Sequence, residues 1–93
     1  MILASYIRPF DAKQKIYVLD NKLNTEEVRL ADLTNYAETV MQLITEYNIS
    51  ELELHGNTDI CARVKQEIQS AEMTKYNNNQ LKISLKGVRI WNI

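Results

Sequence analysis

The sequence predicts one small α/β domain with the element order β-β-β-α-β-α-β, and three observations predict it. The chain has 93 residues, 45% of them apolar and 25% charged, with two glycines and one proline, as in one compact domain without a linker. Short segments of period two fill the first third, and apolar residues then recur about every 3.6 positions. Short connections require right-handed crossovers, so we expect a mixed sheet of order 3-2-1-4-5 with both helices on one face.

The first three strands are predicted from short apolar and β-branched segments. ILASYI, residues 2–7, is apolar on both faces, as in a central strand. KIYVLD, residues 15–20, follows the turn DAKQ and completes a hairpin. EEVRLA, residues 26–31, is the third strand, with Val28 and Leu30 on one face.

Two helices are predicted from apolar stripes at helical spacing. The first follows Thr34, its expected N-cap, and ends near Asn48. Its inward stripe is Leu33, Tyr36, Ala37, Val40, Leu43, Ile44 and Tyr47, and its outward residues are Asn35, Glu38, Thr39, Gln42 and Glu46. The second helix carries Ile60, Cys61, Val64, Ile68 and Ala71 inward and stops at the loop YNNNQ.

The last two strands alternate between apolar and polar residues. ELELH, residues 51–55, places its leucines inward and its two glutamates and histidine outward. LKISLK, residues 81–86, places its aliphatic residues inward and Lys82 and Lys86 outward. We expect these lysines to neutralise the two glutamates across a parallel pair of strands.

The segment VRIWNI, residues 88–93, follows Gly87, which allows a bulge. This segment either continues the last strand or forms a docking tail. Its large apolar residues are Val88, Ile90, Trp91 and Ile93. Leaving them exposed would forfeit about 1.5–3 kcal/mol per aliphatic side chain, so we expect them to lie in a two-fold interface with a second copy.

The stretch HGNTD, residues 55–59, joins a strand to a helix, where many proteins bind phosphate. Such sites usually have several glycines or a lysine, whereas this stretch has Gly56 alone. Asp59 in the first helical turn already complements the helix dipole and repels phosphate. We therefore favour a structural cap, with Asn57 or Thr58 as the N-cap.

Charge and cysteine content exclude several classes of protein. The net charge is −1, with +2 in residues 1–19, −7 in residues 20–59 and +4 in residues 60–93, so no global field attracts nucleic acid or a membrane. Cys61 is the single cysteine, which leaves no intrachain disulfide and no cysteine zinc site. No segment has the pattern of a signal peptide or a membrane span, so we expect a cytoplasmic protein.

The element order, with ILASYIRPFDAKQKIYVLDNKLN as a first hairpin and MQLITEYNISELELHG as a helix-to-strand passage, resembles the ribonuclease H-like fold, in particular small domains of the Holliday-junction-resolvase type. The chain also resembles small uncharacterised proteins of low-GC bacteria and their phages. The resemblance implies two-metal nuclease chemistry, with an aspartate in the first strand. That strand has no acid here, since Asp11 lies beyond it and Glu53 is the only acid at a comparable place. We therefore expect no metal and no other cofactor.

A degenerate nuclease-like enzyme is the alternative to a non-catalytic protein. Glu53 and His55 share one face of a strand, a spacing that can present an acid–base pair, and Asp59 follows at the next helix. The structural interpretation, in which the glutamates pair with lysines, is the one we favour.

A second alternative is weak binding of single-stranded nucleic acid. Its candidate residues are Arg8, Lys13, Lys15 and Tyr17, which combine positive charge with an aromatic ring. The leading hypothesis is a small non-catalytic protein-interaction module, self-associating or an adaptor in a bacterial or phage complex. It follows from an expected sheet face that is apolar at its centre and charged at its rim.

Overall fold

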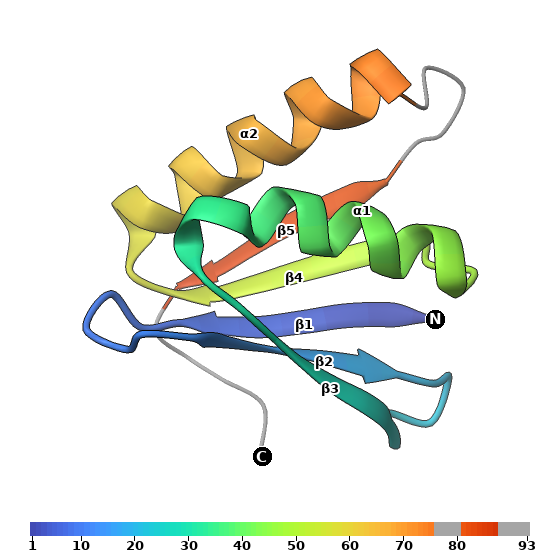
Figure 1. The fold of residues 1–93 in the computed structure, drawn as a ribbon. Coiled ribbons are helices and arrows are strands. Elements are labelled where there is room, and N and C mark those ends of the chain that lie inside the picture. The colour runs from blue at the N-terminus through green and yellow to red at the C-terminus, as the bar shows by residue number, and fades with distance from the viewer. Residues whose placement is uncertain (76–80, 88–93) are drawn as a thin grey trace.

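Five strands form one mixed sheet in a computed structural model of the chain, which describes the backbone of residues 1–75 and 81–87, and the side chains of these residues except 71–75 and 87 (Figure 1). The strands are β1 (Ile2–Ile7), β2 (Gln14–Leu19), β3 (Thr25–Ala31), β4 (Glu51–Gly56) and β5 (Lys82–Gly87). The helices are a 3-10 turn (Leu33–Asn35), α1 (Tyr36–Glu46) and α2 (Thr58–Lys75).

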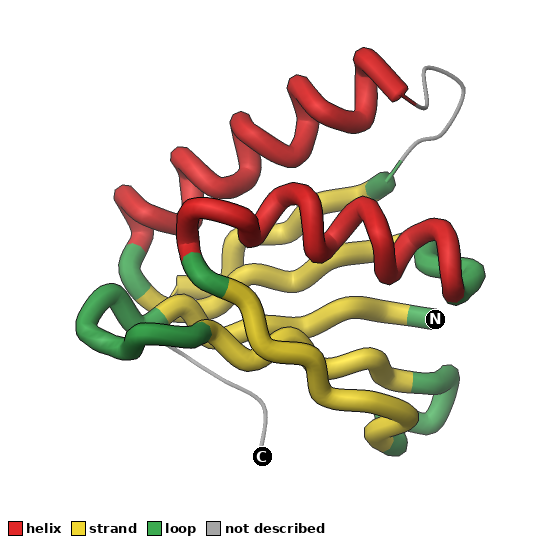
Figure 2. The backbone as a smooth tube through the Cα atoms, in the orientation of Figure 1, coloured by secondary structure: helices red, strands yellow, loops and turns green. Residues whose placement is uncertain are grey.

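The strand order is β3-β2-β1-β4-β5, as the sequence predicts. β1 lies at the centre, antiparallel to β2 and parallel to β4. The connection from β3 through α1 to β4 and the connection from β4 through α2 to β5 move across the sheet in the same direction. Because both crossovers have the same hand, both helices lie on one face of the sheet (Figures 1 and 2).

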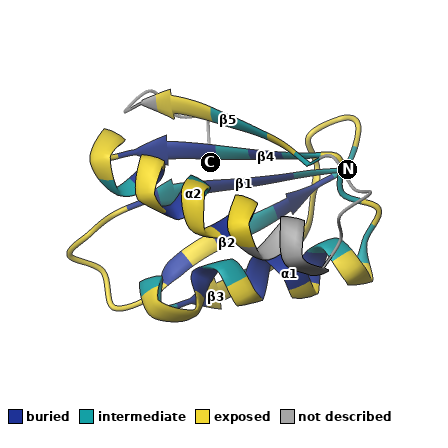
Figure 3. Cartoon of the chain, turned by 90° about the horizontal axis from the view of Figure 1, so that it is seen from above, coloured by how far each residue is buried: buried dark blue, intermediate teal, exposed yellow. Residues whose placement is uncertain are grey.

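The hydrophobic core lies between the two helices and the sheet (Figure 3). The central strands contribute Leu3, Ile7, Ile16, Val18, Leu52 and Leu54, and the helices contribute Tyr36, Val40, Leu43, Cys61, Val64 and Ile68, all buried. Leu85, predicted to face inward, is 39% exposed because β5 is an edge strand. Burial raises the pKa of the Tyr36 phenol, which the neighbouring Ser5 hydroxyl partly offsets.

The start of α1 differs from the prediction. Thr34 is not the N-cap, because it lies inside the 3-10 turn and α1 begins only at Tyr36, after Asn35. Thr39, predicted to face outward, is buried, and its hydroxyl donates a hydrogen bond to the Asn35 carbonyl oxygen at 3.0 Å. A 3-10 turn has about 3.0 residues per turn where an α-helix has about 3.6, so it rotates the following helix relative to the expected stripe.

The turn between β2 and β3 explains why β2 ends before Asp20, which the sequence places in the strand. The Asp20 carboxylate accepts the backbone N–H groups of Lys22 and Asn24 at 2.8 and 2.9 Å. These bonds make the turn and hold the pKa of Asp20 below its usual value. In the register that follows, Val18 pairs with Glu27 and Leu19 with Thr25, so a bulge lies at the start of β3.

A second bulge lies near the end of β5. Leu54 pairs with Leu85, but His55 pairs with Gly87, which leaves one additional residue in β5. The sequence allowed a bulge beside this glycine as one of two possibilities, and the register shows a bulge there. The predicted docking tail, with Val88, Ile90, Trp91 and Ile93, lies outside the described residues.

Candidate nucleic-acid interface

The face of the sheet opposite the helices carries the candidate site. The strand register places one row of residues across it, namely Val28, Tyr17, Ala4, Glu53 and Ser84. Strand residues two positions apart point the same way, so Tyr6, Lys15, Leu30 and His55 belong to the same face. No described helix covers this face (Figure 1). Aromatic, basic and aliphatic side chains therefore lie together on it.

A cavity of about 480 Å³ opens where β1 and β2 meet their connecting turn. The described residues that line it are Tyr6, Arg8, Asp11, Lys13, Gln14, Lys15 and Tyr17. The structure thus brings together all four residues of the predicted nucleic-acid cluster. Tyr6 was missed, although period two on β1 places it on the same face as Ala4, the partner of Tyr17.

Gln14 holds the turn beside this cavity. Its side chain is buried, and its Oε1 accepts the Arg8 backbone N–H at 2.8 Å. Its Nε2 donates to the backbone carbonyl oxygens of Arg8, at 2.8 Å, and Asp11, at 3.3 Å. These three hydrogen bonds fix the backbone that carries Arg8 and Lys13, so the basic groups stand on a defined loop and not on a free one.

The cavity has a modest excess of positive charge. Arg8 Nε lies 3.3 Å from Asp11 Oδ2, and Lys13 Nζ lies 3.2 Å from Asp32 Oδ1. Lys15 forms no salt bridge within the described part of the chain. Both ion pairs are solvent-exposed, and such pairs contribute only about 0–1 kcal/mol. A phosphate group can therefore replace either aspartate at little energetic cost.

Two tyrosines line the same cavity, and a third aromatic residue lies in the adjoining turn. Tyr6 and Tyr17 are partly exposed diagonal neighbours on β1 and β2, where side chains lie roughly 7–8 Å apart. Phe10, in the turn between Arg8 and Asp11, is 99% exposed. Phe10 has no packing partner in the described structure, so its ring is free to contact a ligand.

The residues predicted for a degenerate nuclease do not converge. His55 Nε2 lies 3.3 Å from Glu53 Oε1, so the pair on β4 is present. His55 lies on the outward, helix-free face as predicted, but its side chain is only 5% exposed. Asp59 is exposed in the first turn of α2, which packs on the opposite face of the sheet. The structure therefore joins two of the three residues.

Glu51 and Glu53 do not pair with lysines as predicted. Glu51 Oε2 accepts a hydrogen bond from the Ser84 hydroxyl at 3.1 Å. Lys82 and Lys86 are exposed and form no salt bridge within residues 1–75 and 81–87. Lysine side chains on an edge strand reach water more easily than they reach back over the sheet, and serine stands nearer to the carboxylate.

The stretch HGNTD is a helix cap. The Asn57 side-chain oxygen accepts the Ile60 backbone N–H at 3.0 Å, and its carbonyl oxygen accepts the Cys61 N–H at 2.9 Å. Gly56 has φ +113°, which lets the chain leave β4. The Cys61 thiol contacts the His55 carbonyl oxygen at 3.5 Å, and burial raises its pKa. The sequence predicted either Asn57 or Thr58 as the N-cap, and the structure shows that it is Asn57.

Replacing Asn57 by alanine is expected to destabilise the protein by about 0.5–2 kcal/mol in urea unfolding, because the Ile60 N–H loses its acceptor.

Asp59→Asn removes a favourable charge at the helix start and should lower the free energy of unfolding by roughly 0.3–1 kcal/mol. Thr58→Ala, at an exposed neighbouring position, is the control and should change stability by less than about 0.5 kcal/mol. A more stable Asp59→Asn variant that gains phosphate affinity would contradict the capping role.

No group of three or more His, Cys, Asp or Glu side chains within the described ranges is placed to hold a metal ion. Among the helices of the described chain, none is both long enough and apolar enough to cross a bilayer. No family model, curated protein or solved structure matches the chain significantly.

Proposed function

We propose that this chain is a non-catalytic binding module that takes single-stranded nucleic acid on the helix-free face of its sheet. The observation that carries the proposal is the cavity that assembles Arg8, Lys13, Lys15 and Tyr17 and adds Tyr6.

Two more specific assignments, a ribonuclease H-like topology and a cytoplasmic location, belong to the same proposal. The strand order supports the first, because it joins an antiparallel three-stranded half to a parallel half.

The chemistry of the cavity fits a nucleotide better than a purely apolar or purely anionic ligand. The two tyrosine rings offer faces on which adjacent bases stack, at about 1–3 kcal/mol per base. The Lys15 ammonium group has no competing carboxylate among the described residues. Arg8 and Lys13 can each bind a phosphate by giving up an exposed ion pair with an aspartate. Stacking does not discriminate strongly between bases, so we expect weak sequence preference and strong salt dependence.

Binding is measured by fluorescence anisotropy with a labelled oligodeoxythymidine of about 10 nucleotides, a length within the range that such sites cover. Tyr17→Ala should weaken binding by about 5- to 150-fold, the equivalent of one lost stack. Lys15→Gln should weaken binding and reduce the slope of log K against log salt by about 0.7, the value for one phosphate contact on a single strand.

Two matched variants serve as controls. Tyr17→Phe keeps the ring and should keep the affinity, whereas Lys22→Gln makes the same charge change in the turn between β2 and β3 and should leave the salt slope almost unchanged. Equal losses in Lys15→Gln and Lys22→Gln, or full affinity in Tyr17→Ala, would show that the cavity is not the binding site.

The second candidate function is a protein-interaction module that self-associates or serves as an adaptor. It is favoured by exposed aliphatic side chains on the same face, Val28 and Leu30 on β3. The predicted interface residues Val88, Ile90, Trp91 and Ile93 belong to this proposal. Deleting residues 88–93 and comparing sedimentation with the full chain tests their part in it, and an unchanged oligomeric state would exclude them.

A further inference from the structure

The outer edge of β3 is available for pairing. β3 is an edge of the sheet, and no described strand pairs with its outer side (Figure 1). An edge strand presents unpaired N–H and C=O groups that can bond to another strand, and proteins protect such edges with lysine, proline, a covering segment, a bulge or inward-pointing charges. β3, TEEVRLA, has no lysine or proline, its bulge lies at its start, before Val28, and its inward-pointing Glu27 and Arg29 are already paired with each other. On the helix-free face its Val28 and Leu30 are 44% and 54% exposed.

We propose that β3 pairs antiparallel with β3 of a second copy across a two-fold axis at Val28, so that the two sheets become one. The proposal rests on the protein-interaction function, the second candidate above, and is independent of the nucleic-acid cavity. A two-fold axis perpendicular to the sheet pairs residues of the same face and makes the interface self-complementary. Each Val28 then faces the Val28 of the other copy, and Glu27 of each copy faces Arg29 of the other.

The charges on β3 select this register. With the axis at Val28, two opposite-charge pairs form between Glu27 and Arg29, and such cross-strand pairs are favourable. An axis at Glu27 or at Arg29 would place two like charges directly opposite one another. An axis at Leu30 would leave the first half of the strand unpaired. The alternation of acid, valine and arginine therefore specifies one pairing out of the available ones.

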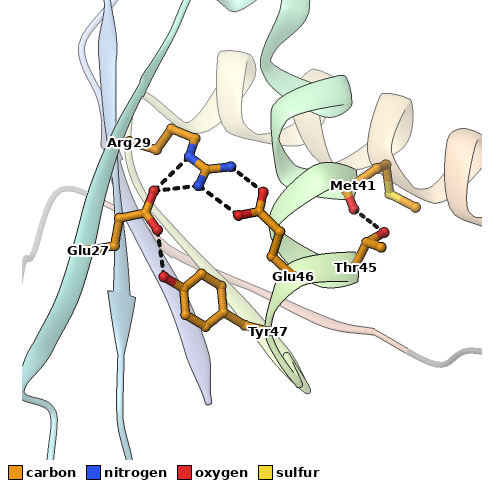
Figure 4. A network of polar contacts seen from close by, with 6 residues as sticks. All are labelled: Glu27, Arg29, Met41, Thr45, Glu46 and Tyr47. Atoms are coloured by element: carbon orange, nitrogen blue, oxygen red, sulfur yellow. Dashed lines mark hydrogen bonds and ion pairs between the residues drawn. The ribbon is translucent and has the colours of Figure 1, made fainter.

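The helix side of β3 holds these charges in position (Figure 4). Arg29 Nε donates to Glu27 Oε2 at 2.7 Å, and its two terminal nitrogens donate to the Glu46 carboxylate at 2.7 and 3.0 Å. Tyr47 donates its hydroxyl to Glu27, which raises the pKa of Tyr47. Two carboxylates thus share one guanidinium in each copy, and two-fold pairing brings a second guanidinium to each Glu27.

Cysteine cross-linking tests the register. Val28→Cys should form a disulfide-linked dimer under mild oxidation, because a residue on the axis lies about 4.5–5.5 Å from its copy, within the range of a disulfide. Leu30→Cys, on the same face, would lie about 13 Å from its copy, which is four residues along the strand, and should not cross-link. The native Cys61 is buried and does not interfere.

Sedimentation velocity supplies the second measurement. The unmodified chain should dimerise, and Val28→Lys, checked for folding by circular dichroism, should weaken dimerisation at least tenfold. Cross-linking of Leu30→Cys at the rate of Val28→Cys would overturn the register. A dimer that persists in Val28→Lys would overturn β3 as the interface and leave self-association standing. A monomer at high micromolar concentration would overturn the pairing itself, and oligonucleotide binding would remain a separate result.

Discussion

Replacing Gly56 by alanine should destabilise the protein by about 2–6 kcal/mol, a large part of the 5–15 kcal/mol that a domain of this size has. At φ +113° an alanine is strained, by about 1–3 kcal/mol. Its Cβ would also lie 2.4 Å from the backbone oxygen of Ile7, and forcing β1 aside adds about 1–3 kcal/mol. A melting temperature more than about 10 °C lower is the expected readout.

The neighbouring Thr58→Ala variant controls for a general effect of changing this loop. Because Thr58 is exposed, its melting temperature should stay within a few degrees of the parent. The obstacle in Gly56→Ala is a backbone atom of the central strand and not a flexible side chain, so no rotamer change relieves it. A Gly56→Ala variant as stable as Thr58→Ala would mean that the close approach of β4 to the end of β1 is wrong.

Replacing Gln14 by alanine should destabilise the protein by about 2–4 kcal/mol. The change removes three hydrogen bonds and leaves the partly buried N–H and carbonyl of Arg8 without these partners. It should also weaken oligonucleotide binding, since Gln14 lines the cavity and fixes the loop that carries its basic groups. Gln66→Ala, on the exposed side of α2, is the matched control and should change stability by less than about 0.5 kcal/mol.

Gln14→Glu tests the hydrogen-bond donor alone, because glutamate has nearly the shape of glutamine but lacks its side-chain NH2 group. A carboxylate keeps the acceptor for the Arg8 N–H but faces the Arg8 carbonyl oxygen without a proton. Burial against carbonyl oxygens raises a carboxyl pKa, so the folded state binds the proton more tightly than the unfolded state. Stability is then greatest below the unfolded pKa, near 4.3, and declines as pH rises through the raised folded value. Stability that does not depend on pH beyond that of the parent would contradict this geometry.

Much of the fold follows from periodicity and connection length. The alternation of ELELH and the helical stripe beginning at Leu33 predicted β4 and α1 within a few residues, because burial on one side imposes a period that is visible in the chain. The order of the strands followed from the handedness of two short crossovers. The start of α1 could not be predicted as well, since a 3-10 turn and an α-helix place the same residues inward for the first few positions.

The candidate site was predicted in part. Basic and aromatic residues on one hairpin pointed to Arg8, Lys13, Lys15 and Tyr17, but nothing in the sequence showed that they would surround a cavity. The sequence predicts Gln14 only as part of the turn DAKQ, because a glutamine that is buried to bind backbone groups looks the same in sequence as an exposed one. The burial of His55 on the helix-free face was also not predictable from alternation. Alternation shows which residues share a face but not how far neighbouring side chains cover each of them.

The central position of β1 has a consequence for how the chain is made. β1 pairs with β2 through a short turn, but its other edge stays unpaired until β4 has been synthesised, because Ile2 pairs with Glu51, the first residue of β4. At roughly 5–20 residues per second, several seconds of synthesis separate the two strands. During this interval the nascent antiparallel half presents the apolar edge of ILASYI, the kind of surface to which chaperones and other nascent chains bind. The slow step of folding should therefore be the parallel docking of β4, since it closes the longest loop in the sheet.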